Sequence, residues 1–344
     1  MTAGLILAVD AMSGDHGAAV AVPAALDVLE ATPDLGLVIV GRGEVVRPLA
    51  AGADPARCRI VEASEVVAMD ERPQDAIRRK KDSSMRVAVN LVKNGEAAAC
   101  VSAGNTGALL AISRFVLGMV PGIDRPAIVS AVPAAHGHTV MLDLGANTDC
   151  SADQLVQFAV MGSVIAADLH GIERPRVGLL NIGEEDIKGT DELREAHRRL
   201  AGSPVNYIGF VEGNLIFSGA VDVVVTDGFS GNVALKTMEG LARFIGSAMR
   251  EEFTASPLRK LGALASAPAL RGLKQRLDPS AYNGASMVGL AGVVIKSHGG
   301  ADRRAFASAV RVAMVEARKG VPTQIGELMA RVEAAQASAV PPAG

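Results

Sequence analysis

Residues 220–239 read AVDVVVTDGFSGNVALKTME, and this stretch determines the architecture that we predict. Residues 221–225 form a β-branched run that predicts a buried strand. Residues 226–232 interrupt it with glycines and small polar side chains, and from Val233 the apolar residues take up helical spacing. A strand that turns through glycines into a helix directs free backbone N–H groups and the positive end of the helix dipole at one point. Such a point favours an anion.

Similar junctions between strand and helix recur along the chain. We expect further strands at residues 5–10, 35–40, 97–102, 127–132, 139–144, 176–182, 205–210, 287–290 and 293–296. Strands that alternate with helices at this spacing predict a mostly parallel sheet covered on both faces, which is a three-layer α/β/α sandwich. Small-residue–Asn pairs follow several of these strands, and each Asn offers a carboxamide where a small neighbour allows close approach. The pairs are Gly104-Asn105, Ala146-Asn147, Gly213-Asn214 and Gly231-Asn232. We therefore expect a lined pocket at the ends of the strands.

The pattern changes after the junction, in residues 233–277, where two long helices joined end to end do not fit a compact sheet layer. We expect a helical hairpin that projects from a single domain of residues 1–337, with a disordered Pro-Ala tail at 338–344. Leu261, Leu264 and Leu270 form an apolar tip between basic residues. That pattern suits an interfacial amphipathic segment, and a dimeric helix bundle would bury the same leucines.

Composition limits the function classes. The chain has 344 residues, no Trp, 3% aromatic residues and a net charge of -3, so it offers neither base-stacking side chains nor a basic field for nucleic acid. Cys58, Cys100 and Cys150 show no CxxC spacing, which favours reduced cytoplasmic thiols. We see no export signal, and the most apolar span, residues 97–120, is interrupted by polar residues and does not predict a membrane crossing.

Four adjacent cations, Arg78, Arg79, Lys80 and Lys81, lie in a predicted helical region. A solvated helix face is the usual interpretation of such a run. The following pair Ser83-Ser84 can start a new helix, and a phosphate or an acidic partner can use both features.

Motifs along nearly the whole chain, from about Leu5 to the last helix, resemble those of the bacterial phosphate acyltransferase family PlsX. They are DAMSGDHG at 10–17, RRKKDSS at 78–84, VSAGNTG at 101–107, DLGAN at 143–147, NIGEE at 181–185 with Lys188-Gly189, DGFSGN at 227–232 and KSHG at 296–299. One departure is Ser13, which stands where a second glycine is expected. The resemblance implies a Rossmann-like fold of the isocitrate/isopropylmalate dehydrogenase type.

The resemblance also implies a reaction, the transfer of a long acyl group from the thioester of acyl carrier protein to inorganic phosphate. The acyl phosphate would then feed a membrane glycerol-3-phosphate acyltransferase at the start of phospholipid synthesis. Phosphate is itself a nucleophile and the thioester is already activated, so the step requires no cofactor, metal or acyl-enzyme. A cytoplasmic homodimer that visits the inner face of the cell membrane follows from the same resemblance, with Arg78 to Lys81 as a docking patch for the acidic carrier.

The site must hold a dianion against a thioester carbonyl and stabilise an oxyanion. Lys188 and Asn232 match functional positions of the family motif, and we expect Lys188 to pair with phosphate or the oxyanion. The side chain of Asn232 and the amides of Gly231 and Asn232 would supply neutral donors. Further substrate-binding candidates are Asp15, His16, Gly104, Asn105, Thr106, Asn147, Gly231 and His298. His16 and His298 are candidate proton donors or phosphate ligands, while Asp15, Asp143 and Asp227 suit helix capping or orientation of donors.

Two other readings stay open. Residues 228–232 form a degenerate nucleophile elbow, with Ser230 as nucleophile and Asp278 and His298 following in the α/β-hydrolase order, although Asn232 replaces the closing glycine. A non-enzymatic scaffold that binds a membrane or a carrier protein would rest on the apolar tip alone. The histidines and cysteines show no metal-ligand spacing.

Overall fold

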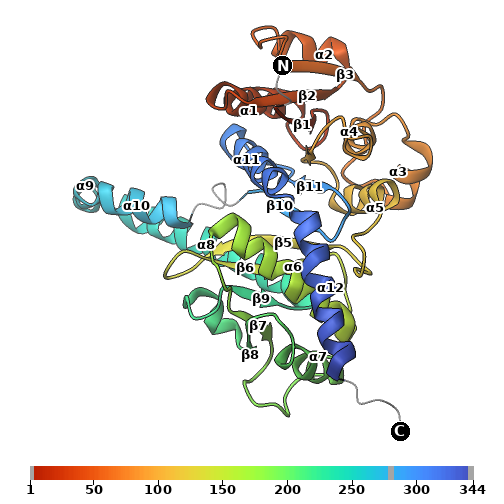
Figure 1. The fold of residues 1–344 in the computed structure, drawn as a ribbon. Helices are drawn as coiled ribbons and strands as arrows, with labels where there is room; N and C mark the ends of the chain where they lie inside the picture. The colour runs from red at the N-terminus through yellow and green to blue at the C-terminus, as the bar shows by residue number, and fades with distance from the viewer. Residues whose placement is uncertain (1–3, 278–282, 340–344) are drawn as a thin grey trace.

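The computed structural model describes residues 4–277 and 283–339. Its strands are β1 (Leu5–Asp10), β2 (Leu35–Gly41), β3 (Cys58–Glu62), β4 (Ala99–Ser102), β5 (Ala127–Pro133), β6 (His138–Leu142), β7 (Val177–Leu180), β8 (Tyr207–Val211), β9 (Val223–Val225), β10 (Ala285–Val288) and β11 (Val293–Lys296). They form one sheet in the order β3-β2-β1-β4-β11-β10-β5-β6-β9-β7-β8, which runs through the whole body of the molecule (Figure 1).

The sheet has two parallel halves. Strands β3, β2, β1, β4 and β11 are parallel to one another, as are β6, β9, β7 and β8. Between the halves, β10 is antiparallel to both β11 and β5, and β5 is antiparallel to β6. The two halves therefore run in opposite directions. The predicted mostly parallel sheet is confirmed, and the antiparallel centre is what joins its halves.

Helices cover both faces, as predicted. They are α1 (Ala18–Ala31), α2 (Gly43–Leu49), α3 (Pro73–Arg79), α4 (Ser84–Lys93), α5 (Thr106–Leu117), α6 (Ala152–His170), α7 (Asp191–Ala201), the 3₁₀ helix η1 (Gly213–Phe217), α8 (Gly228–Thr254), α9 (Pro257–Ala265), α10 (Ala267–Leu277), α11 (Arg303–Lys319) and α12 (Val321–Ala339). On one face, α1 and α11 cover the first half, and α6, α7 and α12 cover the second. On the other face, α4 and α5 cover the first half, and α8 with η1 covers the second. The cores are built from Val, Leu, Ile and Ala, as the scarcity of aromatic residues requires.

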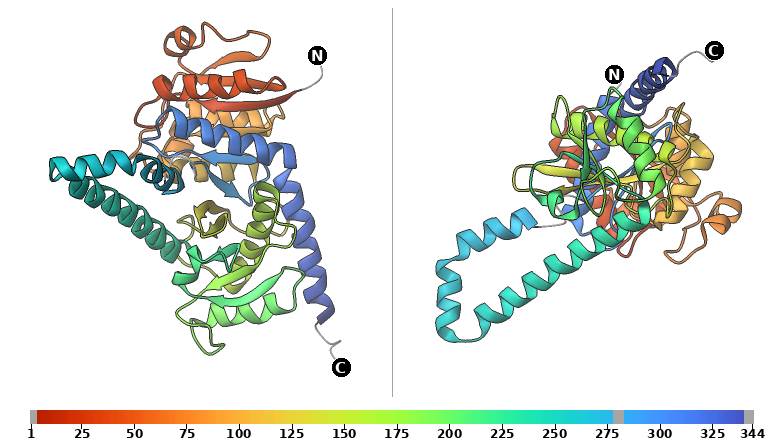
Figure 2. Two further views of the ribbon diagram at one scale, coloured as in Figure 1. Left: turned by 90° about the vertical axis from the view of Figure 1, so that its left-hand side faces the viewer. Right: turned by 90° about the horizontal axis from the view of Figure 1, so that it is seen from below.

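Helices α8, α9 and α10 form an arm that leaves the body and returns to it (Figures 1 and 2). The arm contains three helices where the sequence predicted two, because the second predicted helix, residues 257–277, is divided at Ser266 into α9 and α10. Leu258, Leu261 and Leu264 on α9 are 78%, 63% and 71% exposed. Of the predicted apolar tip, Leu261 and Leu264 are therefore open to solvent in a single chain, and Leu270 on α10 is half-buried.

Several strand boundaries differ from the prediction by one or two residues, and two helix boundaries also differ. Helix α8 begins at Gly228 instead of Val233, because the side chain of Asp227 caps it by accepting a hydrogen bond from the Ser230 amide (2.8 Å). Helix α12 continues to Ala339, so residues 338 and 339 are helical and do not belong to a disordered tail; residues 340–344 lie outside the described part of the chain. Within the described residues, we find no helix with the length and hydropathy needed to cross a membrane.

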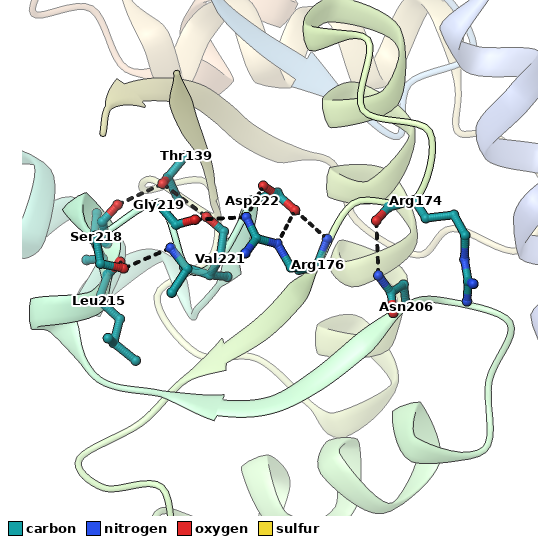
Figure 3. Close-up of polar contacts among 11 residues, drawn as sticks. Thr139, Arg174, Arg176, Asn206, Leu215, Ser218, Gly219, Val221 and Asp222 are labelled. Atoms are coloured by element: carbon teal, nitrogen blue, oxygen red, sulfur yellow. Dashed lines mark hydrogen bonds and ion pairs between the residues drawn. The ribbon is translucent and has the colours of Figure 1, made fainter. Parts of the chain in front are cut away.

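An ion pair fixes the amino-terminal ends of β7 and β9. The Arg176 guanidinium donates to both carboxylate oxygens of Asp222 (2.8 Å each) and to the carbonyl of Gly219 (2.8 Å), as Figure 3 shows. Beside it, the Thr139 hydroxyl donates to the carbonyls of Ile216 and Val221. These contacts hold the strands at the ends opposite to the loops that carry the candidate site.

Candidate active site

The loops that follow β1, β4 and β11 meet at one edge of the sheet. We call residues 11–17, 103–106 and 297–302 the first loop group. The amide of Asp15 donates to the carbonyl of Gly299 (2.9 Å). Gly14, with a φ of 88°, packs against Ala103 and the Gly299 carbonyl so closely that no side chain fits between them. The structure therefore brings together the candidates Asp15, His16, Gly104, Asn105, Thr106 and His298, which the sequence left far apart.

The loops that follow β6, β7 and β9 form the second loop group, residues 143–149, 181–190 and 226–232. Its centre is the fully buried carboxylate of Asp143, which accepts hydrogen bonds from the amides of Ile128, Ala146 and Asn147 (3.0, 3.0 and 2.7 Å). The Asn147 carboxamide donates to Asp143 (2.9 Å) and to the carbonyl of Pro126 (2.9 Å). Asp143 thus orders the loop rather than capping a helix, and both amide hydrogens of Asn147 are committed to that structure.

Asn232 lies in the first turns of α8 and remains exposed. Its carboxamide nitrogen donates to the Leu144 carbonyl (3.1 Å), which leaves one amide hydrogen and the side-chain oxygen for a ligand. The Gly231 amide donates to the Asp227 carbonyl (2.9 Å). This corrects one expectation: the Gly231 amide is part of the helix and is not a free donor.

Lys188 is exposed in the loop between β7 and α7. The Arg194 guanidinium braces this loop by donating to the carbonyls on either side of Lys188, those of Ile187 (3.4 Å) and Gly189 (2.7 Å). Gly189 adopts a φ of 86° against the buried carboxamide of Asn181. Because β7 and β9 are parallel neighbours, the loops that carry Lys188 and Asn232 leave the same edge of the sheet. The two leading candidates therefore belong to one loop group.

Other candidates in the first loop group have structural partners. The Asn105 side chain caps α5 by accepting from the Ala108 amide (3.0 Å), and its nitrogen donates to the carbonyls of Met69 and Glu71 (2.7 and 3.1 Å). A Cβ atom at Gly104 would overlap Met85, so this glycine serves close packing. Nδ1 of His298 accepts from the Gly300 amide (3.1 Å). Asp15, His16 and Thr106 are exposed at the rim.

The strand register shows how the two loop groups are placed. Lys296, the last residue of β11, pairs with Ala285 of β10. Extending the pairing of β10 with β5 by one residue places Ala285 beside Ser130, which pairs with Met141 of β6. Lys296 is therefore level with Met141, although their strands run in opposite directions. Since the strands run in opposite directions, the loops that follow β11 and β6 start about three residues, or roughly 10 Å, apart along the strands, and three strand spacings, or roughly 14 Å, apart across the sheet.

Lys296 is a charged residue at this edge of the sheet that was not among the candidates predicted from the sequence. Its side chain is 8% exposed, and Nζ donates to the carbonyls of Ala103 (3.3 Å) and Ser297. Burial lowers the pKa of Lys296 to about 8; Asp15 and Asp10 oppose this shift and Lys236 adds to it. The sequence feature that could have identified Lys296 is its position at the end of an apolar strand, directly before a Ser-His-Gly-Gly turn.

Ser230 and His298, two members of the predicted hydrolase triad, belong to different loop groups. The Asp227 carboxylate accepts hydrogen bonds from the Ser230 hydroxyl (2.7 Å) and from the Ser230 amide (2.8 Å), and the second bond confirms the cap interpretation of Asp227. His298 follows β11, which β10, β5 and β6 separate from β9, and Asp278 lies outside the described residues. In the part of the chain that the structure describes, no three His, Cys, Asp or Glu side chains form a group that could hold a metal ion.

The four cations lie around the end of α3, which stops at Arg79. Arg79 forms an i,i+4 ion pair with Asp75 (3.7 Å). Ser83 caps α4 by accepting from the Arg86 amide (3.3 Å), so the predicted helix start at the Ser-Ser pair is confirmed.

Comparisons with known proteins agree along nearly the whole chain. A family model described as "Fatty acid synthesis protein" matches residues 5–324. A phosphate acyltransferase of Methylococcus capsulatus (strain Bath) is 56% identical over 333 residues, 96% of this chain and 98% of that protein. A phosphate acyltransferase of Alkalilimnicola ehrlichii is 54% identical over 341 residues, 98% of this chain and 100% of that protein.

Among solved structures, a phosphotransacetylase from Streptococcus pyogenes matches with a TM-score of 0.64. The match covers 93% of this chain and 95% of that chain at 18% identity, so it concerns the fold. A branched-chain phosphotransacylase from Enterococcus faecalis matches with a TM-score of 0.57 at 13% identity, covering 91% of this chain and 99% of that chain. The predicted α/β fold class is confirmed.

Proposed function

We propose, on the premise that the chain belongs to the fatty acid synthesis protein family of phosphate acyltransferases, also called PlsX, that it transfers a long acyl group from acyl carrier protein to inorganic phosphate. The observation that carries the proposal is an identity above 50% with phosphate acyltransferases over nearly the full length of both chains. The chain is therefore an acyltransferase, and the non-enzymatic scaffold is excluded as its sole role.

The reaction needs little covalent chemistry from the protein. A phosphate oxygen attacks the thioester carbonyl, the tetrahedral oxyanion collapses, and the C–S bond breaks to release the carrier thiolate and acyl phosphate. No residue is acylated in this sequence of steps. The task of the site is to hold two reactants in line and to stabilise the developing charge.

Lys188 and Asn232 suit that task. Lys188 carries a mobile positive charge on a braced loop, and Asn232 has an amide hydrogen left beside the Leu144 carbonyl. We assign Lys188 to the phosphate or the oxyanion and the Asn232 side chain to a neutral hydrogen bond with the same group. His16 and His298, at the rim of the first loop group, remain candidates for proton transfer to the leaving thiolate.

Association with other molecules completes the proposal. The exposed cations of residues 78–81 would dock the acidic carrier protein, and the α8–α10 arm would contact a second copy of the chain, the membrane surface or both. The enzyme would work in the cytoplasm at the inner face of the cell membrane. There its acyl phosphate can pass to a membrane glycerol-3-phosphate acyltransferase.

A phosphate-dependence assay tests the reaction. The protein is incubated with a long-chain acyl carrier protein thioester, with and without inorganic phosphate, and the products are identified by mass spectrometry. We expect acyl phosphate only when phosphate is present. Free fatty acid formed at a rate indifferent to phosphate would contradict the proposal and would favour hydrolysis through Ser230.

A further inference from the structure

Lys296 stands out because it is a buried cation that donates no hydrogen bond to a carboxylate. Of the lysines in the described residues, it alone is buried, and its hydrogen bonds go to main-chain carbonyls instead of a carboxylate. The neighbouring carboxylate of Asp10 is itself fully buried and is occupied by the Ser102 hydroxyl (2.6 Å) and the Met12 amide (3.3 Å). Burying an ammonium group costs several kcal/mol unless a partner offsets it. Two carbonyls leave one of its three N–H donors without an assigned acceptor.

The side of the sheet that Lys296 faces is also informative. Along β11, Val293 and Ile295 pack with α1 and α11, whereas Val294 packs with α4 and α5. By the alternation of side chains, Lys296 faces the α4/α5 side. The paired residue Ala285 packs against the same hydrophobic cluster as Ala234 and Leu235 of α8. Lys296 therefore lies where the first loop group faces the first turns of α8, which carry Asn232.

We propose that Lys296 is a second phosphate-binding residue of the acyltransferase, which donates its remaining N–H to inorganic phosphate while Lys188 approaches the same anion from the second loop group. This inference rests on the proposed function, because it assumes that phosphate enters between the two loop groups. A dianion supplies a negatively charged hydrogen-bond acceptor, which the protein itself does not give Lys296. Bound phosphate would then offset the desolvation free energy of the buried Lys296 ammonium, which is uncompensated in the unliganded protein.

The surroundings of Lys296 are accessible enough for an anion to bind reversibly. Asp15, His298 and Gly300 are exposed around the buried ammonium, so the first loop group is open at its rim. The charged groups that act on Lys296 are Asp10 at the end of β1, Asp15 in the loop that follows it, and Lys236 on α8. With its pKa near 8, Lys296 is mostly protonated at neutral pH, and phosphate binding should weaken as the pH rises through that value.

The test compares Lys296→Met with Lys93→Met, an exposed lysine at the far end of α4. The first readout needs no activity: inorganic phosphate should raise the thermal midpoint of the wild type and of Lys93→Met, and should not raise that of Lys296→Met. In the acyl-transfer assay, Lys296→Met should raise KM for phosphate roughly tenfold or more and change KM for the acyl donor little. Lys296→Arg, which keeps the cation, should retain part of the phosphate response.

The outcomes separate the two proposals. Phosphate stabilisation that persists in Lys296→Met, or a raised KM for the acyl donor alone, overturns the role of Lys296. A second outcome is that phosphate stabilises the wild type but not Lys296→Met, while the wild type forms no acyl phosphate. That outcome supports the phosphate-binding site and contradicts the proposed reaction. If Lys296→Met does not fold, wild-type crystals grown with phosphate decide: an anion within hydrogen-bond distance of Nζ supports the site, and an empty position there refutes it.

Discussion

The backbone of Gly231 packs directly against the main-chain carbonyl of Asp143. A Cβ atom at position 231 would lie 3.0 Å from the Asp143 carbonyl carbon and overlap its oxygen. This contact locks the start of α8 onto the turn that follows β6, and so it fixes the position of Asn232 relative to that turn. Position 231 requires glycine because there is no room for a side chain, and not because of its backbone conformation, since its φ is not positive.

We therefore expect Gly231→Ala to destabilise the protein by about 1–3 kcal/mol and to lower acyl transfer further than the loss of folded protein explains. Denaturant unfolding and the specific activity of the folded fraction measure the two effects. Gly246→Ala is the matched control, because the same helix is open at that position. It should stabilise the protein by about 0.5–1 kcal/mol. Equal behaviour of the two variants would show that the contact with Asp143 does not matter.

Lys188→Ala and Asn232→Ala should each lower kcat on the order of a hundredfold, because each removes one group that stabilises the transition state. Lys188→Arg should recover part of that loss through its positive charge. The circular dichroism and the thermal midpoint of all three variants should match the wild type, because both residues are exposed. Normal turnover by a folded Lys188→Ala protein would remove Lys188 from the site.

Local signals in the sequence predicted much of the fold. The first strand was placed at residues 5–10 by its apolar run, and β1 has these bounds. The pair Ser83-Ser84 was predicted to start a helix, and the Ser83 side chain accepts from the Arg86 amide (3.3 Å). The start of α8 was missed because glycines at 228 and 231 read as helix breakers, whereas the Asp227 cap and the tight contact with Asp143 make them compatible with the first turn.

Long-range pairing could not be predicted in the same way. Strand β11 pairs with β4 through Val293 and Ala99, about two hundred residues apart, and nothing local specifies that partner. For the same reason the sequence could not show that Lys296 becomes buried, since the carbonyl of Ala103 that covers it comes from a distant loop. The sequence also could not show that the side-chain amides of Asn105 and Asn147 donate hydrogen bonds to backbone carbonyls.

The arm offers a test of membrane contact. Leu261→Glu combined with Leu264→Glu should lower binding to anionic lipid vesicles by tenfold or more, because each buried leucine contributes about 1.5–3 kcal/mol. Vesicle co-sedimentation measures this, and Ser266→Glu controls for an added charge on the same exposed segment. Sedimentation velocity on the same proteins shows whether the arm instead joins two copies of the chain. Loss of the dimer with vesicle binding retained would assign the leucines to dimerisation.

Glu316 makes the stability of the protein depend on pH. It is 2% exposed on α11 and accepts a hydrogen bond from the Ser286 hydroxyl of β10. Burial raises the pKa of Glu316 to about 8, with a smaller contribution from Asp168. The folded state therefore holds a proton that the unfolded chain releases above about pH 4. The resulting stabilisation is complete below about pH 4 and is lost as the pH rises to about 8.

Glu316→Gln should remove this dependence, because the amide keeps an oxygen for Ser286 and cannot ionise. At 1.36 kcal/mol per pKa unit, the wild type should lose up to about 4 kcal/mol of unfolding free energy between pH 4 and pH 8 that the variant keeps. Urea unfolding at pH 5 and pH 8.5 measures the difference, and Glu327→Gln, an exposed change on the neighbouring helix α12, should behave as the wild type does. If the wild type and Glu316→Gln lose stability in parallel, then the Glu316 carboxylate is accommodated in its charged form. The buried contact with Ser286 would in that case not depend on a proton.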